Sequence, residues 1–387
     1  MTTMADRYTI SKPVKILGLM TGSSADGLDI CLVQFSGRPD QPDYEVTYST
    51  HIQYPEIFYS AFTNPLELDQ TDIRRLDKDL GKWFAVEIEK IDLDFDMIAS
   101  HGQTIKHQPP DFTLQIGDPR FMYEKFDKPV VYDFRTADIE AGGQGAPLIP
   151  IVDQYLFQKE DDDILALNIG GISNLTIVPA RSNKHPLLAW DTGPGNTLID
   201  KAARLFSKGK LSFDPEGSIA AQGNINNKLL GFLLQHEFYQ LSPPRSAGQE
   251  QFGLGYFNSI LKQYHPRDDQ EFKDLAFTLT VLTAKSIASS VLMLPKLYTP
   301  KDLIISGGGF KNLTLISLIK SELSSLSFNE ANINGVNSDN KEAFGFAYLG
   351  YRTLIKLPGN IPSVTGADKA VVLGKLYPPN LKFSHPL

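Results

Sequence analysis

Two glycine-containing turns, each flanked by short apolar segments, constrain the fold more than any other feature of this sequence. The first turn spans residues 21–27, and the second spans residues 170–174. Apolar runs joined by such turns are typical of β-hairpins. Because one hairpin would open each half of the chain, the pattern predicts a duplicated architecture. The flanking strands are expected at Val14–Leu19, Leu28–Phe35, Ile164–Ile169 and Leu175–Val178.

Longer segments repeat apolar residues at helical spacing, and short buried strands alternate with them. This alternation indicates an α/β protein. Asn196 is expected to cap a helix that runs to Phe206. The other expected helices are Thr71–Ile91, Lys273–Leu294, Asn312–Leu323 and Lys341–Leu357, and the further strands are Met97–Ala99, Val130–Tyr132 and Leu303–Ile305.

The chain of 387 residues is long enough for two domains with separate cores. We expect an N-terminal domain at residues 1–140 and a second domain at 141–357, with residues 358–387 packing back on the first. The glycine-rich segment Ala141–Pro147 is the expected passage between them. This segment and the break at Leu357–Gly359 are also the candidate hinges, because glycine absorbs backbone rotation at low steric cost.

Composition excludes several classes of partner. The formal net charge of -8 argues against nucleic acid or an anionic membrane as the main partner, since both are bound mostly through Lys and Arg. The single cysteine, Cys31, excludes an internal disulfide. The N-terminal residues lack the pattern of a signal peptide, and no run approaches the ~20 apolar residues of a membrane span. The cytoplasm is therefore the expected location.

The two turns also carry the first sign of chemistry. Small residues at 21–27 let backbone N–H groups approach an anion, and Ser23 and Ser24 add hydroxyl donors. Alone, this turn is better explained as a polar hairpin, and it lacks the Gly-Lys-Ser/Thr of a Walker loop. Gly170 and Gly171 would supply a matching set of donors. We therefore expect Gly22 and Gly171 to face each other across a cleft that holds a polyphosphate.

A third glycine cluster, Gly307–Gly309, lies between an expected strand and an expected helix. Close approach of the backbone to a base or a ribose explains it as well as tight packing of the helix against the strand. The three glycine turns together favour nucleotide binding over three separate structural explanations.

Polar residues near strand ends are the candidates for catalysis and substrate binding. Asp191 precedes a Gly-Pro-Gly turn, where it could act as a general base or merely cap the turn, and spacing alone slightly favours the cap. The segment His101–Thr104 offers donors and acceptors suited to sugar hydroxyls. Arg135 lies among carboxylates, so an internal salt bridge and ligand recognition explain it equally well. Glu342 is better explained by its favourable interaction with a helix dipole.

In order along the chain, these motifs resemble those of the anhydro-N-acetylmuramic acid kinase family. The resemblance covers nearly the whole chain and implies a two-domain actin-like ATPase fold, that is, a duplicated ribonuclease H-like fold with a central nucleotide cleft, shared with hexokinases and acetate kinase. The matching segments are Gly18–Asp29, His101–Thr104, Asp133–Arg135, Ala141–Leu148, Asn168–Leu175, Asp191–Asn196, Gly307–Gly309, Glu342–Phe344 and Leu357–Ala367.

The resemblance implies an activity. Members of the family use ATP to phosphorylate O6 of 1,6-anhydro-N-acetylmuramic acid while water opens the anhydro ring, which gives N-acetylmuramic acid 6-phosphate and ADP in peptidoglycan recycling. Carried over by position, Asp191 would be the general base, and Mg²⁺ would accompany ATP with ligands that stay unassigned. The implied ATP-binding residues are Gly22, Ser23, Ser24, Ala25, Asp26, Gly27, Leu28, Asp29, Gly170, Gly171, Gly307, Gly308 and Gly309, and the implied sugar-binding residues are His101, Gln103, Thr104, Arg135 and Glu342.

Two segments depart from the family pattern. The first loop reads Gly22-Ser23-Ser24-Ala25, where the family has Gly-Thr-Ser followed by Met. The segment Pro243–Glu250 has Arg, Ala and Gln at the positions where the family has Lys, Thr and Arg. If this second segment touches the substrate, affinity or specificity would change, but the reaction class would not.

Two other functions stay open. One is phosphorylation of an ordinary hexose or amino sugar, in which Asp191 would deprotonate a hydroxyl group. The other is an inactive actin-like nucleotide-binding protein, against which the presence of Asp191 argues. The expected ligands are small molecules, namely ATP and the sugar, and a homodimer stays open beside a monomer.

Overall fold

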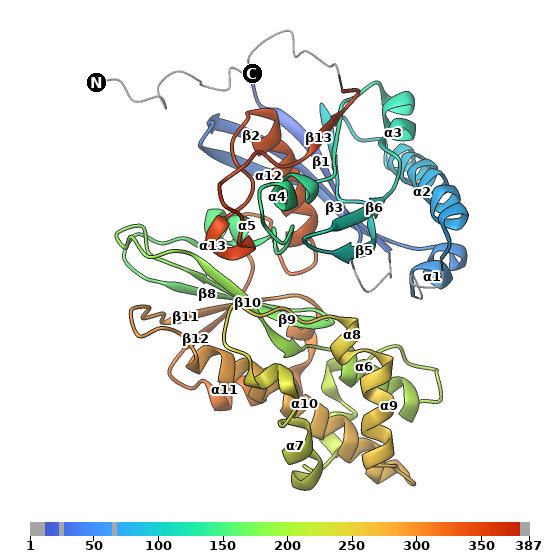
Figure 1. Cartoon of the computed structure of the whole chain (residues 1–387), viewed down its shortest axis with the longest axis vertical. Helices are drawn as coiled ribbons and strands as arrows, with labels where there is room; N and C mark the ends of the chain where they lie inside the picture. The colour runs from blue at the N-terminus through green and yellow to red at the C-terminus, as the bar shows by residue number, and fades with distance from the viewer. Residues whose placement is uncertain (1–11, 23–26, 64–67, 380–387) are drawn as a thin grey trace. The chain divides into compact units, whose positions relative to one another are not determined.

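The structure is a computed structural model that describes residues 12–22, 27–63 and 68–379 (Figure 1). The chain forms two compact units. Unit 1 contains the described residues up to Tyr155, together with Asn332–Val336 and the residues from Asn340 on. Unit 2 contains Leu156–Ala331 and Asn337–Asp339.

Unit 1 is built on a six-stranded sheet in the order β13-β7-β4-β1-β2-β3. The strands β1, β2 and β3 form an antiparallel meander, and β4 and β7 continue the sheet parallel to β1. The C-terminal strand β13 pairs antiparallel with β7. The bounds are β1 Val14–Met20, β2 Gly27–Arg38, β3 Gln41–Gln53, β4 Met97–Ser100, β7 Val130–Tyr132 and β13 Lys375–Tyr377, and a separate hairpin is formed by β5 Gln103–Gln108 and β6 Phe112–Ile116.

Unit 2 repeats this plan in a five-stranded sheet with the order β10-β9-β8-β11-β12. Here β8, β9 and β10 form the antiparallel meander, and β11 and β12 follow parallel to β8. In each sheet the first five strands along the chain thus lie in the order third, second, first, fourth, fifth, and the second of these five is antiparallel to the other four. The bounds are β8 Ile164–Ile169, β9 Ile172–Val178, β10 Leu188–Pro194, β11 Asp302–Ser306 and β12 Ser327–Glu330. The predicted duplication is confirmed.

Helices cover both faces of the unit 1 sheet, which explains why β1 is apolar from Ile16 to Met20. Leu17 and Leu19 pack in a core with residues of α2, whereas Gly18 faces α12. A Cβ at Gly18 would lie 2.1 Å from the backbone oxygen of Ala343, so only glycine lets α12 pack this close to the sheet. The helices of unit 1 are α1 Glu56–Thr63, α2 Gln70–Lys90, α3 Pro119–Phe126, α4 Thr136–Glu140, α5 Pro150–Phe157 (which ends in unit 2), α12 Lys341–Leu354 and α13 Pro362–Thr365.

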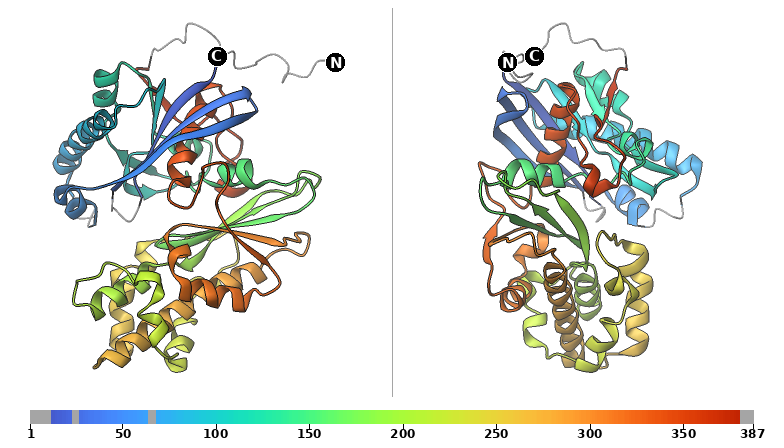
Figure 2. Two further views of the ribbon diagram at one scale, coloured as in Figure 1. Left: turned by 180° about the vertical axis from the view of Figure 1, so that it is seen from behind. Right: turned by 60° about the vertical axis from the view of Figure 1, so that its left-hand side comes forward.

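In unit 2, α10 is the central helix and packs with α6 and α11 on one face of the sheet (Figure 2). Its apolar residues Leu275, Leu279 and Leu282 are fully buried in the core. The helices of unit 2 are α6 Thr197–Phe206, α7 Asn227–Leu233, α8 Gln249–Phe252, α9 Leu254–Gln263, α10 Asp269–Leu292 and α11 Leu313–Glu322, with short 3-10 helices η3 Pro215–Gly217, η4 Ala220–Gln222, η5 Glu237–Gln240 and η6 Gly308–Lys311.

The expectation that no segment could span a membrane needs a correction. Within the described ranges, α10 is the one helix with the length and composition of a membrane span, with a mean hydropathy of 1.5. However, 72% of its most apolar window is buried inside the protein. Its hydrophobicity is therefore that of a core helix.

The two units differ from the expected domains. The expected boundaries after residues 140 and 357 both fall inside unit 1. The reason for the first is Asp138, a buried carboxylate that accepts hydrogen bonds from Gly145 N (2.7 Å), Asn360 Nδ2 (2.7 Å) and Thr365 Oγ1 (2.7 Å). This network ties the segment Ala141–Pro147 to the C-terminal part of unit 1.

The second expected boundary also lies in a bonded segment. The backbone N–H of Gly359 donates to the Val371 carbonyl at 2.9 Å, and Arg352 Nε donates to the Pro358 carbonyl at 2.5 Å. Neither candidate hinge therefore joins two units. The chain instead passes between the units at Tyr155/Leu156 and within residues 331–340.

Candidate active-site residues in the two units

Asp191 lies in β10, at a β-bulge between Asp191 and Gly193. Its backbone and side chain are both held by the segment that follows η5. Asp191 N donates to the Arg245 carbonyl at 2.9 Å, and Ala247 N donates to Asp191 Oδ2 at 2.7 Å. The carboxylate is therefore fixed, and one of its oxygens is left with no protein donor among the described contacts.

The electrostatic surroundings of Asp191 make it a base suited to neutral solution. The pKa of its carboxyl is raised to about 6, mainly by burial and to a smaller extent by the charge of Glu250. The Ala247 N–H and the Arg245 guanidinium act in the opposite direction. A carboxylate with a pKa in this range is largely ionised at neutral pH and is more basic than an exposed Asp.

Arg245 holds the backbone around Asp191. It is 6% exposed and donates from Nε to the Asp191 carbonyl at 3.2 Å and from Nη2 to Ser290 Oγ at 2.9 Å. Its Nη1 donates to the carbonyls of Phe238 and Leu241 at 3.3 and 3.0 Å. A guanidinium used in this way stabilises the loop and has little capacity left for a substrate.

This geometry explains the first two departures in Pro243–Glu250. Arg245 supplies its positive charge to the loop itself, and Ala247 contacts Asp191 through its backbone N–H, so a threonine hydroxyl is not needed for that contact. At the third departure, Gln249 Nε2 lies 3.5 Å from Thr197 Oγ1, at the start of α6. Sequence reasoning did not find the role of Arg245, because the contact requires the fold.

The second glycine turn lies beside Asp191 in unit 2. The Gly171 carbonyl accepts from Gly195 N at 2.9 Å and from Thr197 N at 3.1 Å, and the Gly170 carbonyl accepts from Asn196 N at 2.8 Å. The turn is thus packed against the start of α6. The expected side-chain cap by Asn196 is wrong, because its Nδ2 instead donates to the Ile169 carbonyl at 3.2 Å.

Packing explains two of the three glycines at Gly307–Gly309. Gly307 has a positive φ of 84°, and a Cβ on Gly309 would lie 2.3 Å from Ile169 Cγ2. Gly308, in contrast, has nothing within 4 Å of an added Cβ and is exposed. Of these three glycines, Gly308 is the one that packing does not explain, so contact with a ligand is the better explanation there.

The first turn is described only in part. Ser23, Ser24, Ala25 and Asp26 lie outside the described residues, so their roles stay predictions. Leu28 is fully buried in the core, so only its backbone could reach a ligand. Asp29 Oδ1 lies 2.7 Å from His51 Nδ1, a hydrogen-bond contact with a residue of β3 that sequence reasoning missed. The alternating pattern of Gln41–Gln53 could have revealed this strand.

In unit 1 the predicted sugar-binding residues lie near one another. Arg135 donates from Nε and Nη2 to His101 Nε2 at 3.1 and 2.9 Å and from Nη1 to the Gly145 carbonyl at 2.8 Å. Burial and the Arg135 charge lower the pKa of His101 well below its usual value, so His101 is neutral. The pKa of Arg135 is lowered to about 10 by burial, although the charge of Glu342 acts in the opposite direction.

Gln103 and Thr104 extend this group. Gln103 Oε1 accepts from the Tyr54 hydroxyl at 3.1 Å, and its Nε2 donates to the Gly22 carbonyl at 3.4 Å. Thr104 Oγ1 accepts from Gln115 Nε2 at 3.2 Å. These contacts place the sugar candidates beside Gly22, which lies in the first turn.

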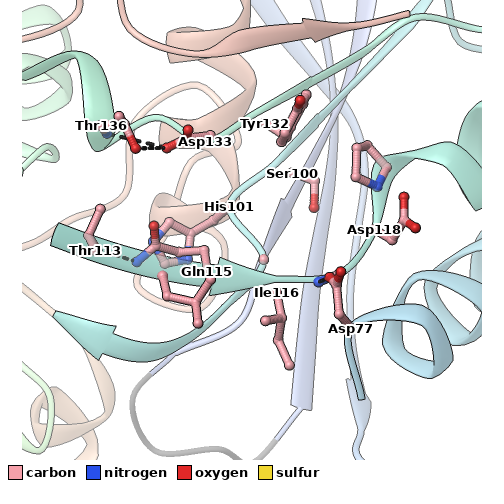
Figure 3. A pocket seen from close by; sticks show the side chains of 14 residues that line it. Asp77, Ser100, His101, Thr113, Gln115, Ile116, Asp118, Tyr132, Asp133 and Thr136 are labelled. Carbon is pink, nitrogen blue, oxygen red and sulfur yellow. Dashed lines mark hydrogen bonds between the residues drawn. The ribbon is translucent and has the colours of Figure 1, made fainter. Parts of the chain in front are cut away.

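Next to His101, unit 1 contains a cavity of about 360 Å³ (Figure 3). It lies at the carboxyl ends of the parallel strands β4 and β7, between the start of α3 and the hairpin strand β6. Among the described residues, no group of three or more His, Cys, Asp or Glu side chains could hold a metal ion by itself.

The sheets and the site together define a class. Two copies of one five-strand plan, each with a glycine turn after its first strand, and a fixed carboxylate beside the second turn are the features of a two-domain actin-like ATPase.

The comparisons with known proteins give the family. The family model described as anhydro-N-acetylmuramic acid kinase matches residues 14–379, and the chain belongs to this family. Proteins named anhydro-N-acetylmuramic acid kinase from Prochlorococcus marinus (strain MIT 9313) and Caldanaerobacter subterraneus subsp. tengcongensis are 36% and 37% identical to it. These alignments cover 93% of this chain and 98% and 96% of the relatives.

Two solved structures show a distant likeness. An activator of 2-hydroxyisocaproyl-CoA dehydratase from Clostridium difficile with bound ADPNP has a TM-score of 0.39 and 11% identity, with 88% of this chain and 97% of that chain covered. A ROK family glucokinase from Streptomyces griseus in complex with glucose and AMPPNP has a TM-score of 0.37 and 12% identity, with 86% and 97% covered.

Proposed function

We propose that this protein uses ATP to phosphorylate O6 of 1,6-anhydro-N-acetylmuramic acid while water opens the anhydro ring. The products are N-acetylmuramic acid 6-phosphate and ADP, and the reaction belongs to peptidoglycan recycling in the cytoplasm. The family match over residues 14–379 carries this proposal. The geometry of Asp191 supports its chemical part.

Asp191 would act as the general base. The attacking water gives a proton to its carboxylate as the water oxygen bonds to the anomeric carbon. The bond from that carbon to O6 breaks, and O6 takes the γ-phosphoryl group instead of a proton. A single carboxylate then suffices, whereas an inverting glycosidase needs a second carboxyl group as the acid. Two observations fit this role. The pKa of about 6 makes the carboxylate basic, and the hydrogen bond from Ala247 N holds it in a fixed position.

Backbone N–H groups would bind the phosphates of ATP. In unit 2 these are at Gly170 and Gly171, and in unit 1 they belong to the turn from Gly22 to Asp29. The open Gly308 would lie at the adenosine. Phosphoryl transfer requires positioning and charge neutralisation more than covalent help. Mg²⁺ commonly keeps several waters and is held by substrate phosphates with one or two carboxylates.

The sugar would bind next to the His101–Arg135 pair. Arg135 is the cation of this group, and Glu342 is close enough to affect its pKa. His101 is neutral and accepts from Arg135, so it orients the guanidinium. Gln103, Thr104 and Glu342 would add hydroxyl contacts.

An assay with two sugars tests the proposal. We expect ATP-dependent formation of a sugar 6-phosphate with 1,6-anhydro-N-acetylmuramic acid and no ADP formation with N-acetylmuramic acid. In ¹⁸O-labelled water, one labelled oxygen should appear at C1 of the product. Phosphorylation of the open sugar at a similar rate would instead identify a kinase of ordinary amino sugars.

A further inference from the structure

The unit 1 cavity contains a buried hydroxyl group that has no role in the fold. Ser100, the last residue of β4, is 2% exposed and lines the cavity. Its Oγ has no hydrogen-bond partner among the described residues. A buried polar group without a partner destabilises the fold, so one in a residue that lines a cavity indicates a bound molecule.

The place and size of the cavity fit a small organic ligand. Ligands of open α/β sheets bind outside the carboxyl ends of the strands, where Ser100 ends β4 and Tyr132 ends β7. The volume of about 360 Å³ lies within the usual range for ligand pockets. Asp133, which follows Tyr132, has a positive φ of 52°, a strained conformation of the kind found at binding sites.

The charges of the residues that line the cavity determine which chemical groups of a ligand can bind there. Asp77, Asp118 and Asp133 line the cavity, and no Lys or Arg is among the described lining residues. Arg120 and Lys375 pair with Asp118 and Asp133 from outside it, at 2.7 Å each. Figure 3 shows Ser100 among these carboxylates. Such a wall accepts hydrogen bonds from hydroxyl or amide groups and repels a carboxylate.

We propose that this cavity binds the uncharged face of the amino sugar, its hydroxyl and N-acetyl groups, through Ser100. The lactyl carboxylate points out of the cavity, toward the side where Arg135 contacts His101. This inference rests on the proposed function and adds the orientation of the sugar and a binding residue to it.

The test is Ser100→Ala, measured with 1,6-anhydro-N-acetylmuramic acid and with 1,6-anhydro-N-acetylglucosamine, which lacks the lactyl group. We expect KM to rise about 5–10-fold for the first sugar, and KM or the inhibition constant to rise equally for the second, since the serine contacts a part that both share. The kcat should change less than about threefold. Ser100→Val, which places a methyl group in the cavity, should raise KM more.

Stability separates binding from structure. Since Ser100 Oγ has no protein partner, Ser100→Ala should leave the melting temperature unchanged or raise it. Thr353→Val is the matched control: the Thr353 hydroxyl is buried and donates to the Leu349 carbonyl at 2.9 Å, so its loss should lower the melting temperature and leave KM unchanged.

Each other outcome overturns the inference in a distinct way. An unchanged KM for Ser100→Ala removes the cavity from sugar binding, although the proposed function stands. An effect on the anhydromuramic sugar alone reverses the orientation. No turnover of the anhydro sugar by the unaltered protein refutes the proposed function, and the inference fails with it.

Discussion

At the scale of single residues, the variant Asp191→Asn should lose catalysis but keep ATP binding. Asn can still accept the hydrogen bond from Ala247 N, so Asp191→Asn should fold normally but cannot take a proton. We expect kcat to fall by ~10²–10⁴-fold. ATP binding, measured by calorimetry, should stay within about threefold of the unaltered protein. A kcat within a few-fold of normal would remove Asp191 from the mechanism.

The acid limb of the pH–rate profile should report the same carboxyl group. Because the base must be ionised, kcat/KM should fall below a pH of about 6, the pKa of Asp191 in the folded protein. Arg245 lowers this pKa and Glu250 raises it. Arg245→Met should therefore move the limb to higher pH, and Glu250→Gln should move it to lower pH.

A rescue variant controls this experiment. Arg245→Lys keeps the positive charge that the family has at this position. The acid limb of its pH–rate profile should therefore lie at the same pH as in the unaltered protein, even if the lost hydrogen bonds reduce stability. General destabilisation would lower the rate without moving the limb. If both charge-removing variants shift the limb in the same direction, the electrostatic account of Asp191 is wrong.

At the scale of elements, paired glycines distinguish ligand contacts from packing. A Cβ at Gly171 or Gly308 meets nothing within 4 Å, whereas a Cβ at Gly195 would lie 2.3 Å from the Gly170 carbonyl oxygen. Gly171→Ala and Gly308→Ala should keep the melting temperature and raise KM for ATP several-fold. Gly195→Ala should lower the melting temperature. Unchanged KM in both stable variants would argue against nucleotide binding at these turns.

The same elements show what a sequence can predict. β1, β2, β8 and β9 were predictable because their apolar runs end at glycine turns. β10 was not, because Thr192-Gly193-Pro194 breaks its apolar pattern, although Asp191 lies in it. Asp191 itself came from motif resemblance, since spacing alone favoured a cap. The Arg245 loop and the cavity at Ser100 could not be found from the sequence, since both depend on contacts between distant residues.

At the scale of the whole molecule, the proposed ATP residues belong to both units, so ligand should couple the units. We expect X-ray scattering to give a smaller radius of gyration when a non-hydrolysable ATP analogue and the anhydro sugar are bound together. Closure would keep bulk water out and limit ATP hydrolysis. Sugar alone is the control. An unchanged radius at demonstrated saturation of both ligands would contradict the coupling.

The expected domain boundaries failed at this scale for a physical reason. Glycine content suggested a linker at Ala141–Pro147, but the buried Asp138 network binds that segment to residues near the C-terminus. A flexible linker and a tight turn are both rich in glycine, so composition does not distinguish them. The hydrogen bonds to residues far along the chain do.

The place of α12 in the chain has a consequence for biosynthesis. Unit 1 begins the chain, yet the helix that packs against β1 is made only after all of Leu156–Ala331. On the ribosome, the N-terminal sheet therefore emerges with one apolar face uncovered, whereas nearly all of unit 2 is one continuous segment that can complete its core first. This reverses the usual order in which the N-terminal domain folds first. We therefore expect the nascent N-terminal half to be the part of the chain most prone to aggregation during translation.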